Sequence, residues 1–128
     1  MNLKIHRGTK AIGGSCVELI SQGKSLILDI GTPLVNEDGS SFDDKSLHKS
    51  IAELLENKLL PPIQGLYENE SCNISGVILS HSHQDHFGLA HYVQSNIPIY
   101  VTEGTKELIN ISQIFLPNLP KIENLKTL

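Results

Sequence analysis

A short apolar stretch, from Gly76 to Leu79, leads directly into the residues His-Ser-His-Gln-Asp-His at positions 81–86. The apolar stretch predicts a short buried β-strand, and residues 87–94 predict a helix. Metal-binding side chains therefore follow the carboxyl end of a strand, which is where α/β proteins place their active sites. This segment constrains the fold most strongly, because a strand and a helix must hold these polar side chains in place.

Four of these six residues are zinc ligands by chemical type: His81, His83, Asp85 and His86. Zinc binds imidazole nitrogen and carboxylate oxygen at about 2.0–2.2 Å. Alternate residues of an extended segment point to the same side. We therefore expect His81 and His83 to bind one metal, and Asp85 with His86 to face a second. A structural alternative, in which Asp85 only caps a helix that begins at His86, leaves three neighbouring histidines unexplained. The other histidines are expected to be structural or exposed: His6, His48 and His91.

The remaining sequence predicts an antiparallel opening followed by alternating strands and helices. Three strands are expected first, at residues 3–5, 15–20 and 25–30, and the third is an almost continuous apolar run typical of burial on both faces. A helix over residues 47–59, capped by Asp44 or Ser46 and ended by Pro61, comes next. A strand at 98–101, a helix at 102–111 and a weakly periodic tail at 117–128 complete the expectation, with parallel pairing through crossover helices.

Composition excludes several classes of protein. The formal net charge is -4 and the Lys and Arg residues form no block, so the basic surface of a nucleic-acid binder is missing. No apolar run approaches the roughly 20 residues needed to cross a bilayer, and the first residues lack the apolar core of a signal peptide. The two cysteines, Cys16 and Cys72, form no zinc-finger spacing. We expect reduced thiols in a cytoplasmic protein that does not contact membranes.

Residues 81–86 resemble the H-x-H-x-D-H signature of the metallo-β-lactamase superfamily, with all four metal-binding positions matched. The resemblance implies that His81 and His83 bind the first metal, and that Asp85 and His86 bind the second. It also implies that Asp85 is catalytic, because the family aspartate handles protons during hydrolysis. Asp29 resembles an earlier family aspartate that lies under the metal site and supports its loops.

The fold that the resemblance implies is α/β, or α+β in some schemes: half of an αββα sandwich, with a mixed β-sheet and flanking helices. Residues 1–128 are then a single incomplete domain, the N-terminal half, because the later ligands of the family have no counterpart in this sequence. The sheet face that a second sheet would cover is expected to be exposed. We therefore expect the chain to be inactive alone, and to associate with itself or with a missing C-terminal half.

The function that the resemblance implies is metal-dependent hydrolysis by a metal-bound hydroxide, with two Zn²⁺ in the complete site and Mn²⁺ or Fe²⁺ as substitutes. Residues 12–15 (Ile-Gly-Gly-Ser) and 97–100 (Ile-Pro-Ile-Tyr) are similar to the ribonuclease J and β-CASP-like branch. This similarity favours phosphodiesterase or ribonuclease-like activity on RNA or DNA. The alternative is a metal-binding or interaction fragment without catalytic activity.

Overall fold

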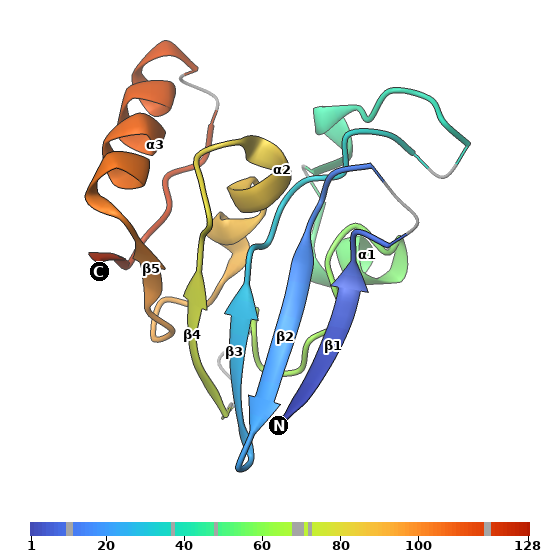
Figure 1. The fold of residues 1–128 in the computed structure, drawn as a ribbon. Helices are drawn as coiled ribbons and strands as arrows, with labels where there is room; N and C mark the ends of the chain where they lie inside the picture. The colour runs from blue at the N-terminus through green and yellow to red at the C-terminus, as the bar shows by residue number, and fades with distance from the viewer. Residues whose placement is uncertain (10–11, 37, 48, 68–70, 72, 117–118) are drawn as a thin grey trace.

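The computed structural model describes residues 1–9, 12–36, 38–47, 49–67, 71, 73–116 and 119–128. Its centre is a six-stranded sheet with the strand order β1-β2-β3-β4-β5-β6. Figure 1 labels the first five of these strands. The first three strands pair antiparallel and the last three join the sheet in parallel. The predicted α/β class with a mixed sheet and flanking helices is therefore confirmed.

Each strand is short, and the order in the sheet follows the order in the chain. The strands are β1 (Asn2–Arg7), β2 (Cys16–Ser21), β3 (Lys24–Leu28), β4 (Ile74–Ile78), β5 (Ile99–Val101) and β6 (Leu125–Thr127). A tight turn at Gln22 and Gly23, both with positive φ, joins β2 to β3. Every parallel connection passes through helical structure, as crossover geometry requires.

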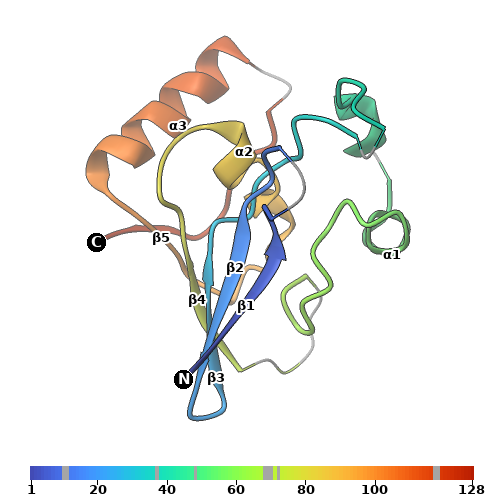
Figure 2. The ribbon, with the colours of Figure 1, turned by 45° about the vertical axis from the view of Figure 1, so that its right-hand side comes forward.

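The helices are α1 (Ile51–Glu56), α2 (Gln84–Phe87) and α3 (Glu103–Phe115), with 3-10 turns η1 (Asp44–Leu47) and η2 (Ala90–Tyr92). Helix α1 lies to one side of the sheet (Figure 2). A capping box fixes its start, because the Ser50 hydroxyl accepts from the Glu53 N–H while the Glu53 carboxylate accepts from the Ser50 N–H. Helix α2 lies at the carboxyl ends of β3 and β4 (Figure 1).

Several predicted boundaries were wrong. The helix expected over 47–59 is only six residues long, with Ser50 as its cap rather than Asp44 or Ser46. The helix expected at 87–94 begins earlier, at Gln84, and gives way to a separate 3-10 turn. Strand β6 was not predicted, because its pairing with β5 is non-local and its three residues carry no pattern.

The two faces of the sheet differ in burial. Ile27, Val77 and Ile99 are almost completely buried on the face that carries the core. Leu26 and Leu28 alternate with Ile27, and both stay half-buried on the other face. Strand β3 is therefore buried on one face and not on both, contrary to the prediction from its apolar run.

No helix in the described part of the chain combines the length and the apolar character needed to cross a bilayer.

Candidate metal centre

The candidate site begins where β4 ends. The Asp29 N–H, directly after β3, donates to the Ile78 carbonyl at the end of β4 at 2.9 Å. The chain then bends through residues 81–83 and enters α2, which carries Asp85 and His86. Helix α2 begins three residues before the predicted start at residue 87, so Asp85 lies in its first turn. The helical turn still directs Asp85 toward the same space as His81.

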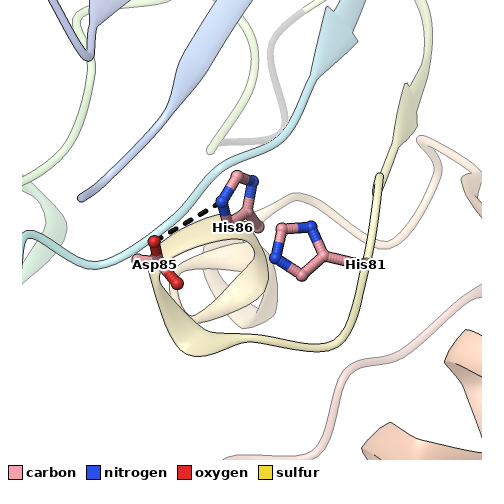
Figure 3. A group of neighbouring side chains, drawn as sticks. All are labelled: His81, Asp85 and His86. Atoms are coloured by element: carbon pink, nitrogen blue, oxygen red, sulfur yellow. Dashed lines mark ion pairs between the residues drawn. The ribbon is translucent and has the colours of Figure 1, made fainter.

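Three of the four predicted ligands converge. The metal-binding atoms of His81, Asp85 and His86 all lie within 4.8 Å of one another, and the three side chains are partly buried (Figure 3). The Oδ2 atom of Asp85 lies 3.4 Å from Nε2 of His86. A tetrahedral ion with bonds of about 2.0–2.2 Å separates neighbouring ligand atoms by ~3.4 Å. The Asp85–His86 pair therefore has the spacing of two ligands on one ion, and the two imidazoles with the carboxylate have the chemistry of a three-ligand zinc site.

His83 lies outside this group. Its side chain is exposed, it occupies the N-cap position of α2, and its ring meets the His81 ring edge-on at a centroid distance of 4.8 Å. A ligand role for His83 therefore stays a prediction. His6 instead pairs with Glu18, and His91 contacts the ring of Tyr92. His48 lies outside the described residues.

Asp29 lies directly beneath the cluster. It is 8% exposed and follows β3 with φ of 59°. Its Oδ1 accepts from the Ser80 N–H at 2.7 Å, and its Oδ2 accepts from the Ser80 hydroxyl at 2.8 Å and from Nδ1 of His86 at 2.8 Å. A carboxylate on the far nitrogen of a metal-binding imidazole fixes the ring and raises its basicity. These contacts are the ones that a supporting role for Asp29 requires, and the role itself stays a prediction.

Backbone hydrogen bonds fasten α2 to the segment that follows β3. The Ile30 N–H donates to the His86 carbonyl at 2.8 Å, and the Thr32 N–H donates to the Gln84 carbonyl at 3.0 Å. The Thr32 hydroxyl donates to the same Gln84 carbonyl. On the other side, the Ser15 N–H donates to the Asp85 carbonyl at 3.1 Å. A helix of only four residues is thereby held in one orientation by its neighbours.

Sequence reasoning missed the polar partners of the cluster, above all Ser80 and Thr32. Ser80 directly precedes the motif, and its hydroxyl lies 3.0 Å from Nδ1 of His81 and 3.3 Å from Nδ1 of His86. A hydroxyl residue between a buried strand and a histidine is a weak signal, since serine is common at strand ends. The contact with Asp29 depends on the β3–β4 register, which connects residues 51 positions apart.

A hollow of about 690 Å³ lies elsewhere in the described structure. Arg7, Pro33 and Lys58 are among its lining residues, and none of the four predicted ligands is. The Arg7 guanidinium is already engaged, because it donates to the carbonyls of Lys58 and Leu59. Burial is the main cause that lowers the pKa of Arg7. This hollow is separate from the candidate metal centre.

Comparison with known proteins supports a family for part of the chain. Residues 68–113, which contain β4, the histidine cluster and most of α3, match the model of the metallo-beta-lactamase superfamily. No curated protein matches the chain. The family match supports the resemblance inferred from residues 81–86 at the level of the superfamily.

Three solved structures are similar to this chain over a fraction of their length. A protein of unknown function from Enterococcus faecalis matches 98% of this chain, with 24% identity and a TM-score of 0.77. Human tRNase Z, short form, matches 99% of the chain, with 19% identity and a TM-score of 0.47. DIM-1 metallo-beta-lactamase matches all of the chain, with 14% identity and a TM-score of 0.49. The chain spans 33%, 45% and 52% of these three proteins, respectively.

Proposed function

We propose that this chain, whose residues 68–113 match the metallo-β-lactamase superfamily, supplies part of the metal centre of a metal-dependent hydrolase. The observation that supports the proposal most is the convergence of His81, Asp85 and His86 within 4.8 Å at the carboxyl edge of the sheet. Imidazole and carboxylate together suit zinc, and also Fe²⁺ and Mn²⁺. Zinc is the ion that we propose for this donor set.

A zinc ion bound here would act as a Lewis acid and would lower the pKa of water to about 7. Residues of this chain position the atoms that would bind the ion. His81 and His86 direct imidazole nitrogens toward the side of Asp85 (Figure 3). Asp29 accepts a hydrogen bond from Nδ1 of His86, so Nε2 of that ring is the nitrogen that would bind the ion. Asp85 would contribute one carboxylate oxygen to such an ion and would offer the other as a proton acceptor, which is the catalytic role that we assign to it.

The substrate in this proposal is a phosphodiester, RNA or DNA, and the branch is that of ribonuclease J and the β-CASP-like enzymes. Both rest on the similarity of residues 12–15 and 97–100 to that branch. The net charge of -4 gives no electrostatic attraction for a polyanion, so phosphate recognition would have to come from the metal centre itself or from another part of the protein. The buried free thiol of Cys16 is compatible with the cytoplasmic location that we include in the proposal.

Within the described residues, one such cluster of three ligands is present, and His83 adds a fourth candidate at its edge. A two-metal centre in this superfamily requires further ligands. We therefore expect this chain to bind metal without efficient hydrolysis, and we expect activity from a protein in which further ligands complete the site. The half-buried sheet face formed by residues such as Leu26 and Leu28 is the surface through which we propose that a second half or a second copy associates.

The test is phosphodiester hydrolysis in a protein that contains this chain and further metal ligands, with bis(p-nitrophenyl) phosphate as substrate and nitrocefin as the β-lactam comparison. We expect zinc-dependent cleavage of the phosphodiester, lost in Asp85→Asn and retained in the control Glu107→Gln. Cleavage that is unchanged after chelation or in Asp85→Asn would refute the hydrolase. Metal binding without any hydrolysis would favour the non-catalytic metal-binding module.

A further inference from the structure

Ser80 lies at the junction of the cluster and its supporting carboxylate. Its hydroxyl oxygen is 2.8 Å from Oδ2 of Asp29, 3.0 Å from Nδ1 of His81 and 3.3 Å from Nδ1 of His86. Its backbone N–H also donates to Oδ1 of Asp29. One small side chain thus touches both imidazoles of the candidate metal centre and the carboxylate beneath them.

The direction of each hydrogen bond follows from the groups available. A serine hydroxyl has one hydrogen to donate and can accept from two directions, whereas an ionised carboxylate only accepts. Hydrogen bonds to an ionised acceptor are the stronger ones, so the Ser80 hydrogen goes to Asp29. The oxygen of Ser80 is then left as an acceptor that faces His81. Nδ1 of His81 must therefore carry the hydrogen in this 3.0 Å contact.

The same reasoning separates the two imidazoles. Nδ1 of His86 is nearer to the Asp29 carboxylate, at 2.8 Å, than to the Ser80 oxygen, at 3.3 Å. Asp29 alone is therefore sufficient to keep the hydrogen on Nδ1 of His86. No hydrogen bond joins His81 to Asp29 in the described part of the chain, and the Ser80 hydroxyl is the group that connects them.

We infer that Ser80 is a positioning residue that selects the Nδ1–H tautomer of His81, and so presents Nε2 of that ring to the metal. The Ser80 hydroxyl donates to Asp29 and accepts from His81. One buried carboxylate thus orients two candidate ligands, His86 directly and His81 through Ser80. Groups behind the metal ligands commonly change metal affinity about 10–100-fold when they are removed. This inference rests on the proposed metal centre, but the tautomer itself is a property of the metal-free protein.

The experiment measures the tautomers directly. Metal-free ¹⁵N-labelled protein is studied by long-range ¹H–¹⁵N correlation of the histidine rings at about pH 8, above the usual histidine pKa of about 6.5. We expect Nδ1–H for both His81 and His86 in the wild type. In Ser80→Ala, His81 should lose this preference while His86 keeps it. Ser80→Thr, which retains the hydroxyl, should restore the wild-type pattern.

The matched control is Ser82→Ala, two residues away on the same bend, because the Ser82 side chain makes no hydrogen bond within the described part of the chain. It should leave both tautomers unchanged. Zinc affinity, measured by competition with a chromophoric chelator, should fall about 10–100-fold in Ser80→Ala and remain near wild type in Ser80→Thr and Ser82→Ala.

The outcomes separate the two proposals. An Nε2–H tautomer of His81 in the wild type, or an unchanged His81 tautomer in Ser80→Ala, overturns the role of Ser80. If Ser80→Ala does not fold, the wild-type tautomer of His81 decides by itself. The expected tautomers together with no zinc binding by the wild type would support the role of Ser80 in orienting His81 and would refute the metal centre.

Discussion

Gly31 lies directly against the backbone of Asp85, so closely that a Cβ atom on Gly31 would lie 1.7 Å from the Asp85 carbonyl oxygen. Position 31 does not require glycine for its backbone conformation, because the φ of Gly31 is not positive. The requirement is for space: the segment after β3 and the helix that carries the ligands pass each other without room for a side chain. The close packing helps to fix the position of a helix of four residues that carries two candidate ligands, Asp85 and His86.

Substitution Gly31→Ala should therefore destabilise the protein by at least the ~1–3 kcal/mol typical of overpacking, because two backbone segments must move apart. Urea unfolding followed by circular dichroism measures this change. The control is Gly104→Ala in α3, where an added Cβ meets nothing within 4 Å. That change should be neutral or stabilising by up to about 1 kcal/mol. Equal effects of the two substitutions would disprove the close packing at Gly31.

Substitution Asp29→Asn should preserve the fold and weaken metal binding. Asparagine tolerates the positive φ at this position and has nearly the same shape, but it removes the negative charge that accepts from His86 and Ser80. We expect zinc affinity about 10–100-fold below that of the wild type, measured by chelator competition. Asp43→Asn, in an exposed loop, is the matched control. Unchanged affinity in Asp29→Asn would show that the carboxylate does not support the site.

Glu18 should make stability depend on pH in the acid range. Burial opposes ionisation of this carboxyl, but hydrogen bonds from Ser25 and His6 outweigh burial and hold its pKa below the ordinary value of 4.5. A carboxyl with a lowered pKa in the folded state stabilises the fold above its unfolded pKa, and this contribution is lost as the pH falls through the folded pKa. Unfolding free energies of the wild type should thus decline on acidification below about pH 5.

In Glu18→Gln this part of the decline should be missing, and the free energy of unfolding at neutral pH should be about 1 kcal/mol lower than that of the wild type. Glu56→Gln, at an exposed position on α1, serves as the control and should follow the wild-type profile. The measurement is urea unfolding at a series of pH values. Parallel wild-type and Glu18→Gln profiles would rule out the contribution of this carboxyl.

Cys16 should resist thiol reagents in the folded protein. Burial raises the pKa of its thiol to about 12, and its side chain is completely buried. The thiolate is the reactive form, so little of it exists near neutral pH. In a Cys72→Ser variant, which leaves one thiol, iodoacetamide labelling at about pH 8 should require unfolding of the chain. Rapid labelling of this variant in native buffer would contradict the burial of Cys16.

The sequence was sufficient to predict the antiparallel opening, the parallel second part and the place of the His-rich segment after β4. Local patterns determine these features: the apolar alternation around Ile27, and the cluster of histidines after Leu79. The start of α2 was predicted too late, because hydrogen bonds from Ile30 and Thr32 to the helix carbonyls are non-local. Spacing in the sequence alone could not show these contacts.

The ligand cluster was predicted by residue type, but its arrangement was not. An extended segment would have placed His81, His83 and Asp85 on one side, whereas the bend and the helical turn bring together His81, Asp85 and His86. The role of Ser80 was not visible either, because its contact with Asp29 arises only when β3 and β4 pair in their observed register.

Zinc binding by the purified chain tests the central claim most directly. Metal-free protein is dialysed against buffered zinc, and bound zinc is measured by elemental analysis for the wild type, His86→Ala and the control His91→Ala. The account predicts zinc bound by the wild type and by His91→Ala, and its loss in His86→Ala. No zinc on the wild type, or as much zinc on His86→Ala as on the wild type, would contradict it.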